Sequence, residues 1–485
     1  MLSDGQVAIW WVRRDFRLAD NPALRSAIDD GEAVLPLFVL DPVLLASAGL
    51  ARRKWLMAAI YSLDHDLRDT GGPGLSVLSG KPVNVLPRVA KAHQAPWVHV
   101  SADFGPYGRL RDERVAQALS RAGIELIRTG SPYAVAPGTL KNRSGEPFQV
   151  FTPFHRAWLD HGVGEPAPGI HARTVTWLRA DGPRRLESPD EDLGSLAGEK
   201  PARKAWHAWL RRDSEGVTDY AKLHDFPGVD ATSHLSIALR WGHLHPRTVL
   251  HDLSQRRSSG ADALARQIAW RDFFADVLFH RPEAIGEPIR DEFSAMPTDD
   301  PDTGEVAAQR FRAWKEGTTG YPLVDAGMRQ LQAEGWMHNR VRMVVASFLI
   351  KDLHIGWWHG AEWFMECLRD GDVAQNQLNW QWVAGCGTAA APYFRIFNPT
   401  GQAEKFDPDG SYIRRYVPEL ADVPIEHLYQ PWAADDGVPK GYPKPIVDHA
   451  AERKEALDRY AVVKGRWAEA GASTSVSRAR VIGAS

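Results

Sequence analysis

Short, almost entirely apolar segments alternate with longer mixed segments over the first 130 residues. Strands of this length without polar alternation are typical of a parallel sheet that is covered on both faces. Amphipathic stretches at 46–67 and 109–122 are expected to be connecting helices. The pattern predicts an N-terminal, Rossmann-like α/β domain with strands at 7–12, 34–40, 75–79, 97–100 and 124–129.

The hydrophobic pattern changes after residue 130. Residues 131–200 are rich in Pro, Gly and charge, apart from an amphipathic stretch at 151–161, and we expect a long inter-domain connection there. Helical periods follow and predict an all-helical domain over 201–470, whereas 471–485 form a polar tail. The expected division is therefore 1–130, 131–200, 201–470 and 471–485. The expected helices are 202–213, 219–225, 246–256, 261–279, 305–316, 322–334, 337–353, 358–369 and 446–470.

The turn after the first expected strand does not suit a dinucleotide. A GxGxxG fingerprint would be needed there, so that the backbone could approach a pyrophosphate. The chain has instead Arg13-Arg14-Asp15-Phe16-Arg17. This disfavours an NAD-dependent dehydrogenase.

Composition limits the possible partners and compartments. With 58 Lys+Arg against 61 Asp+Glu, a nucleic-acid site has to be a local basic patch. Two cysteines, Cys367 and Cys386, exclude a disulfide framework and favour the cytoplasm. No metal site is expected, and His243 and His245 are interpreted as loop or DNA-face histidines. No apolar run of about 18 residues predicts a membrane span.

The chain contains 19 Trp, most of them between Trp206 and Trp382. One lies in a helical pattern that places Gln267, Trp270, Arg271 and Phe274 on a single face. The face combines an amide, a stacking ring and a cation, which suits a ligand. It also suits an ordinary domain contact with an extended Arg side chain.

Two further clusters carry polar side chains in the expected helical domain. Tyr220 and the hydroxyl-rich segment 232–236 could bind phosphate oxygens, or the hydroxyls could simply cap a helix. The segment 335–343 places Trp336, Asn339, Arg340 and Met343 on one helix face, with His338 and Arg342 on the next. Asp370 is the simplest ion-pair partner for Arg342. Such a pair could belong to a ligand site, or it could serve only the fold.

The ordered motifs of this chain resemble those of the photolyase/cryptochrome family, in particular its bacterial members that repair cyclobutane pyrimidine dimers. The resemblance runs from about residue 7 to about 465. It rests on Trp11-Val12-Arg13-Arg14-Asp15-Phe16-Arg17-Leu18, Thr318-Thr319-Gly320-Tyr321-Pro322, Gly335-Trp336-Met337-His338-Asn339-Arg340, Asp370-Gly371-Asp372, Trp380-Gln381-Trp382 and Ala391-Pro392-Tyr393-Phe394-Arg395-Ile396-Phe397-Asn398-Pro399.

The resemblance implies a light-driven lyase that uses reduced FAD. Its FAD phosphates and ribityl chain would be held by Tyr220, Thr232, Ser233, Leu235 and Ser236. An Arg342–Asp370 pair would lie along the flavin edge, Asp372 would bond the isoalloxazine and Asn376 would face its N5.

The resemblance also implies UV-damaged DNA as the partner, with the lesion flipped out of the duplex. Trp270 and Trp382 would stack on the dimer, and Gln267 would bond its base edges. Further residues of the DNA-binding set would be Arg271, Asn339, Arg340, Met343 and Gln402.

Family members reduce their flavin through three tryptophans, of which Trp380 and Trp357 match the proximal and middle ones. Thr298 stands where the distal Trp is expected. Trp314, Trp336 or Trp358 could substitute for it if the fold brings one of them close.

Several departures bear on substrate and antenna. Gln267 replaces the usual Glu, and the absence of a His pair at Asn339 and Met343 favours cyclobutane dimers over (6-4) photoproducts. The segment 105–109 resembles deazaflavin-binding relatives more than those that bind methenyltetrahydrofolate. Little sequence follows the last expected helix, which favours repair over a cryptochrome-like photoreceptor, the alternative. A monomer is expected because it suits an enzyme that docks on a duplex.

Overall fold

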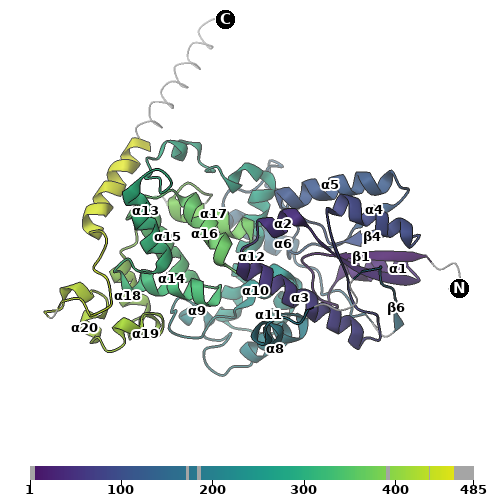
Figure 1. Ribbon diagram of the computed structural model, residues 1–485, viewed down its shortest axis with the longest axis horizontal. Coiled ribbons are helices and arrows are strands. Elements are labelled where there is room, and N and C mark those ends of the chain that lie inside the picture. Colours follow the sequence, from purple (N-terminus) through teal and green to yellow (C-terminus); the bar gives the residue numbers. More distant parts are fainter. Residues whose placement is uncertain (1–5, 171–173, 183–186, 389–393, 436, 464–485) are drawn as a thin grey trace, which may run out of the picture. The chain divides into compact units, whose positions relative to one another are not determined.

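The computed structural model describes residues 6–170, 174–182, 187–388, 394–435 and 437–463 (Figure 1). The chain forms two compact units. Unit 1 contains residues 1–224, 231–282 and 365–374, and unit 2 contains 225–230, 283–364 and 375–485. The expected tail at 471–485 lies outside the described residues. Among those residues, no helix combines the length and apolar character that a membrane crossing requires.

Unit 1 is built around a parallel sheet with the strand order β3-β2-β1-β4-β5, and a short sixth strand pairs with β2. The predicted strands are confirmed to within one residue at either end. Their side chains are almost wholly buried in β1 and β2, as two covered faces require. The bounds are β1 Val7–Val12, β2 Ala33–Leu40, β3 Ser76–Ser79, β4 Trp97–Val100, β5 Glu125–Arg128 and β6 Thr176–Trp177.

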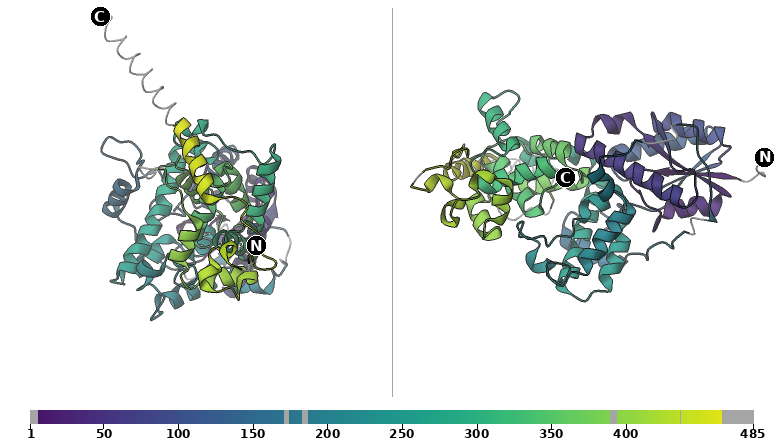
Figure 2. Two further views of the ribbon diagram at one scale, coloured as in Figure 1. Left: turned by 90° about the vertical axis from the view of Figure 1, so that its left-hand side faces the viewer. Right: turned by 60° about the horizontal axis from the view of Figure 1, so that its bottom comes forward.

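Helices cover both faces of this sheet (Figures 1 and 2). Trp10 and Val12 point into a core shared with α1 and α3, whereas Ile9 and Trp11 point into a core shared with α4 and α5. This alternation follows from the two-residue period of a strand. The bounds are α1 Pro22–Asp30, α2 Pro42–Ala46, α3 Leu50–Asp69, α4 Pro82–Ala92 and α5 Pro106–Ser120.

The segment predicted as an irregular connection contains regular structure. Residues 176–177 extend the sheet by pairing with β2, and the amphipathic stretch at 151–161 forms a helix. The helices of this part of unit 1 are α6 Phe151–His161, α7 Glu191–Leu196, α8 Glu199–Leu210, α9 Tyr220–Leu223, α10 Leu235–Trp241, α11 Pro246–Ser254 and α12 Ser259–His280.

Unit 2 is helical in its described residues, as the sequence predicts. One boundary differs: Gly335 adopts a left-handed conformation that ends α14, and the next helix begins only at Asn339, after His338 caps it. Trp336 therefore lies between helices and does not share a helix face with Asn339. The helices are α13 Glu305–Glu316, α14 Pro322–Glu334, α15 Asn339–Lys351, α16 Trp357–Cys367, α17 Val373–Ala384, α18 Pro399–Phe406, α19 Ser411–Tyr416, α20 Ile425–Leu428 and residues 449–463.

Candidate functional site

A cluster of charges lies at the carboxyl ends of β1 and β4, where the strand order changes direction. The Arg13 guanidinium pairs with Asp112 at 2.5 Å and lies over the Trp11 ring. Arg111 pairs with both Asp103 and Asp112 and lies over the same ring. Ligands of open α/β sheets bind in the crevice at this switch point. The edge is therefore a candidate ligand site within unit 1.

The polar and aromatic face of α12 is present, and one of its rings is already stacked. Phe151 of α6 lies on Trp270 with centroids 3.7 Å apart and an angle of 8° between the planes. Gln267, one turn earlier, is exposed. Arg271 donates to the carbonyls of Pro132 and Leu239, so its guanidinium anchors α12 to neighbouring chain segments.

The hydroxyl-rich segment before α10 is partly open. Thr232 and Ser233 are half-buried, Ser236 is exposed and Leu235 is buried. His234 precedes the helix in a left-handed conformation. Tyr220 is buried in the same unit, edge-on to Trp209. The hydroxyls and backbone amides of this open segment suit an anion, as phosphate binding requires.

The Asp370-Gly371-Asp372 segment is packed into unit 1. Asp372 accepts a hydrogen bond from Arg14 at 2.5 Å and another from the Ala374 amide. Burial opposes the charge of Arg14, but Asp372 and the other anionic partners outweigh it, and the pKa of Arg14 is raised. Asp370 is also buried. Its predicted partner Arg342 belongs to unit 2, where it donates to the Met337 carbonyl.

In unit 2, four of the predicted DNA-binding residues come from two helices, α15 and α18, that are in contact. Asn339 and Met343 lie one turn apart on α15, with Nδ2 3.8 Å from Sδ. The Arg340 guanidinium lies 4.2 Å from the centroid of the Phe406 ring and pairs with Asp225 at 2.8 Å. Gln402, on α18, presents a buried Oε1 that has no partner among the described residues.

The amide of Asn376 is held in one orientation on α17. Its Nδ2 donates to the Ala361 carbonyl at 2.9 Å and to Gln377 Oε1 at 2.8 Å. Both donor hydrogens are therefore used within unit 2, which leaves Oδ1 as an acceptor. On the same helix the Trp380 ring packs on Gly360, at a distance that a Cβ there would obstruct.

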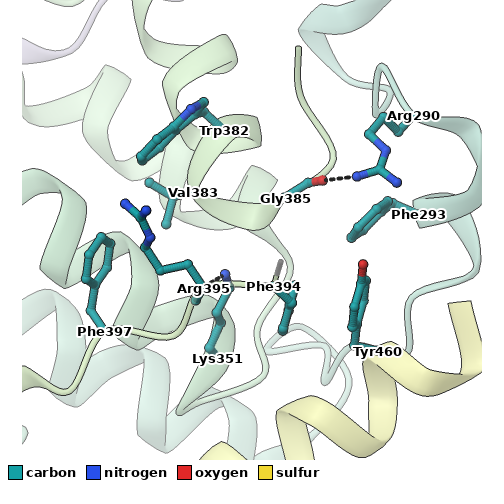
Figure 3. Close-up of a pocket in the computed structure, with 10 residues that line it drawn as sticks. All are labelled: Arg290, Phe293, Lys351, Trp382, Val383, Gly385, Phe394, Arg395, Phe397 and Tyr460. Atoms are coloured by element: carbon teal, nitrogen blue, oxygen red, sulfur yellow. Dashed lines mark hydrogen bonds between the residues drawn. The ribbon is translucent and has the colours of Figure 1, made fainter. Parts of the chain in front are cut away.

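Trp382 lines a pocket with basic and aromatic walls (Figure 3). Arg395 lies beside the Phe397 ring, and its head extends toward Trp382. Lys351 lies over the Phe394 ring and donates to the Arg395 carbonyl, and its burial lowers its pKa to about 7. The neighbouring motif residues 391–393 lie outside the described residues.

Two family models match this chain: "DNA photolyase" over residues 8–171 and "FAD binding domain of DNA photolyase" over residues 264–462. A deoxyribodipyrimidine photo-lyase from Streptomyces griseus is 39% identical, with 92% of this chain and 97% of that protein covered. The chain belongs to the DNA photolyase family.

Solved photolyase structures share the fold. A bacterial class III photolyase from Agrobacterium tumefaciens is 36% identical, with a TM-score of 0.85 and 96% of this chain and 99% of that chain covered. An archaeal photolyase from Sulfolobus tokodaii, solved with two FAD molecules, is 28% identical, with a TM-score of 0.80 and 94% and 100% covered. The predicted family and fold class are thereby confirmed.

Two residues within the matched FAD-binding domain have chemistry that suits an FAD: in unit 2 Asn376 offers an oriented acceptor, and in unit 1 Asp372 is a buried carboxylate. The segment before α10, in unit 1 and outside that match, offers amides and hydroxyls that suit phosphates. The domain binds FAD, as the matched family model shows. Which individual residues contact the cofactor stays a proposal.

Sequence reasoning missed several residues of this photolyase that fix the predicted ones. Phe151, Asp225 and Phe406 each contact a predicted binding residue, but the sequence predicts no role for any of them, although Asp225 stands close to Tyr220 in the first polar cluster. Their spacing from those residues along the chain, 115 residues for Asp225 and Arg340, gives no local signal.

His243 and His245 lie in the loop between α10 and α11, but neither ring faces a surface that DNA could reach. Both are buried in unit 1, where His243 accepts from the Trp55 indole at 3.2 Å and His245 bonds the Ser131 carbonyl at 2.7 Å. The loop interpretation is therefore confirmed, and the DNA-face interpretation is wrong. A His-x-His spacing in a loop suggests two side chains at the surface. Here tertiary packing buries both rings and gives each of them a hydrogen-bond partner.

One group of possible metal ligands lies elsewhere. Asp300, Asp302 and His359 each offer a ligand atom within 4.8 Å of the others. Asp300 and Asp302 are exposed, and exposed acidic groups commonly gather without a metal.

Proposed function

We propose that this photolyase repairs cyclobutane pyrimidine dimers in DNA under blue light. Bound FAD in its reduced form supplies the electron that opens the cyclobutane ring and receives it back afterwards. The observation that carries the proposal is the set of oriented side chains on α15 and α18. Asn339 and Met343 contact each other, and neither position holds the His that (6-4) repair would require by family resemblance.

The chain's own residues would bind and orient the flipped lesion. Trp270 and Trp382 would stack on its bases, each contact being worth about 1–3 kcal/mol per base. Gln267, Asn339 and Gln402 would bond the base edges, supported by the exposure of Gln267 and the unpartnered Oε1 of Gln402 among the described residues. Arg340 would contact a DNA phosphate, and Arg271 would act by holding α12 in place.

FAD contacts follow the same reasoning. Tyr220, Thr232, Ser233, Leu235 and Ser236 would hold the phosphates and ribityl chain, which the partly open hydroxyl segment before α10 supports. Both hydrogens of the Asn376 Nδ2 already donate to protein acceptors, so its Oδ1 would accept a hydrogen bond from flavin N5–H. Arg342 with Asp370, and Asp372, would contact the isoalloxazine.

We propose the carboxyl edge of the sheet as the antenna site. Trp11, Arg13 and Arg111 gather there, at the switch point of the strand order where open α/β sheets bind their ligands. A deazaflavin suits the Gly105-Pro106-Tyr107-Gly108 segment better than methenyltetrahydrofolate. The Sulfolobus tokodaii photolyase, with its two FAD molecules, supports a flavin-type ligand. The chain is proposed to act as a cytoplasmic monomer, which its two free cysteines and its need to dock on a duplex support.

A binding experiment separates repair from a photoreceptor function. Affinity for a duplex with one thymine dimer and for the undamaged duplex is measured in the dark over a series of salt concentrations. We expect tighter binding of the damaged duplex and a fall in affinity with salt, because phosphate contacts release counterions. Asn339→Ala should reduce the preference for damage, and Gln332→Ala, an exposed change on α14, should not. Equal affinity for both duplexes would favour the photoreceptor.

A further inference from the structure

Thr298 occupies the place where the family resemblance implies a distal tryptophan. It is exposed, and its neighbour Asp299 donates its amide to the His354 carbonyl at 2.8 Å. The segment is therefore fixed beside the residues that lead into α16. A threonine side chain has no ring that could lose an electron, so an electron path from Trp380 and Trp357 needs another end.

A second indole lies directly beside Trp357. The rings of Trp357 and Trp358 are 6.2 Å apart at their centroids and meet edge-on at 80°. Trp357 is 5% exposed, whereas Trp358 is 39% exposed. The Trp358 ring also lies over Gly356, where a Cβ would approach it to 2.4 Å. A buried ring is thus in contact with a ring that reaches solvent.

The Trp380 ring contacts the helix that carries Trp357 and Trp358. Gly360 lies against the Trp380 ring, and residues 357 and 360 are one turn apart on α16. Side chains with this spacing lie on the same face of a helix. Trp357 and the contact of Gly360 with the Trp380 ring therefore lie on one face of α16, and Trp357 in turn contacts the exposed Trp358 ring.

The other tryptophans of this region suit the role less well. Trp314 lies 6.2 Å from Trp380 but is 0% exposed, and its indole N–H donates to the Val345 carbonyl. Trp336 packs edge-on against His338, at the start of α15. Trp363 lies on α16, but the Lys315 ammonium is 5.1 Å from its ring and would oppose a positive charge there.

Charges around Trp358 favour a transient positive charge. The His359 ring is 5.7 Å from it, and His359 Nε2 is 3.8 Å from the carboxylate of Asp300. Asp302 belongs to the same acidic group. The acidic group is thus linked to the Trp358 ring through His359, and its negative charge favours a positive charge in this region by Coulomb attraction, which solvent screens.

We propose that Trp358 is the terminal tryptophan electron donor of this photolyase, in place of the missing distal tryptophan. This rests on the proposed function, because it concerns how the flavin is brought to its reduced form. With FAD bound and light-excited as the oxidant, Trp380 would give up one electron and would be refilled from Trp357, and Trp357 from Trp358, so that two such cycles would supply the two electrons of full reduction. Trp358 then loses its indole proton to water, and an external thiol restores its electron and proton.

The test compares Trp358→Phe with Trp432→Phe, a half-buried tryptophan of unit 2 that packs on Tyr321. Oxidised holoenzyme is excited by a laser pulse, and the absorption of the tryptophan radical is followed in time. We expect the long-lived radical to be lost in Trp358→Phe and kept in Trp432→Phe. Adding Thr298→Trp to Trp358→Phe should restore it. An unchanged radical lifetime in Trp358→Phe, or equal losses in both variants, would overturn the proposal.

A measurement on the unaltered protein provides an independent check. Deprotonation of an exposed indole radical should accelerate with the concentration of buffer base, whereas a radical confined to buried Trp357 should not respond. Chemically reduced Trp358→Phe should still repair dimers at the wild-type rate. If chemically reduced wild type repairs nothing, the proposed function fails, while the radical measurements still decide the role of Trp358.

Discussion

The Phe151 ring lies flat on Trp270, with their centroids 3.7 Å apart and an angle of 8° between their planes. Phe151 comes from α6 and Trp270 from α12, so a segment expected to be a connection fixes a predicted dimer-binding ring. One face of Trp270 is covered by this contact, which restricts the ring to a single orientation. A preorganised ring loses less conformational freedom when a base stacks on it.

Replacing Phe151 should therefore weaken dimer binding, although Phe151 acts through Trp270 and not by contacting DNA itself. We expect Phe151→Leu to lower affinity for dimer-containing DNA because Trp270 gains rotational freedom. Phe154→Leu is the matched control: Phe154 is equally buried on α6, and its ring contacts Phe148 and Phe273. Both should cost similar unfolding free energy in urea. An equal loss of dimer affinity in the two variants would contradict the positioning role.

Gln267 should contribute one hydrogen bond to a base edge. Removing it in Gln267→Ala is expected to weaken dimer binding by about 0.5–1.5 kcal/mol, the net value of a typical hydrogen bond. Gln255→Ala is the matched control, because it removes an exposed amide at the end of α11, outside the proposed site. The effect of Gln267→Ala should persist at high salt, since salt screens interactions between charges and no charge is removed. Unchanged affinity in Gln267→Ala would remove this residue from the site.

His243 should make the protein less stable in mild acid. Burial lowers its folded-state pKa to about 4 from the usual 6.5, so between these values the unfolded chain binds the proton and the folded protein does not. Stability is therefore lost as pH falls from about 6.5 toward 4, by up to about 3 kcal/mol. Urea unfolding at about pH 7 and pH 5 measures this slope. His243→Gln keeps an acceptor for Trp55 and should show a shallower slope; an identical slope would contradict the assignment.

The Arg14–Asp372 pair should affect FAD retention. Asp372→Asn leaves a mostly buried guanidinium without its anion and removes a proposed flavin contact. We expect a lower FAD content after purification together with a lower Tm. Asp352→Asn, which removes a buried carboxylate beside His449 in unit 2, should lower the Tm but keep FAD. Full FAD content in Asp372→Asn would show that this carboxylate serves the fold alone.

The sequence predicts the sheet strands well because their apolar runs are long and bounded by turns, as in 7–12 and 34–40. It predicts the two-residue strand at 176–177 poorly, because its pairing with β2 comes from tertiary structure. The motif residues on α15 and α17 are recognisable by their order along the chain. Their partners are not: Phe151 and Asp225 act across large sequence separations, and the burial of His243 depends on Trp55 and Phe16. What distinguishes Trp358 from Trp314 is the exposed fraction of the side chain, 39% against 0%, which depends on tertiary structure.

The most direct test of the account is light-driven repair by the reduced protein. The holoenzyme is reduced chemically without oxygen, mixed with an oligonucleotide that holds one thymine dimer, and illuminated with blue light while base absorbance is followed against a dark control. The account predicts that absorbance rises only in the light, and that an oligonucleotide with a (6-4) photoproduct shows no rise. Absence of any rise with the dimer, when the flavin is present and reduced, would contradict it.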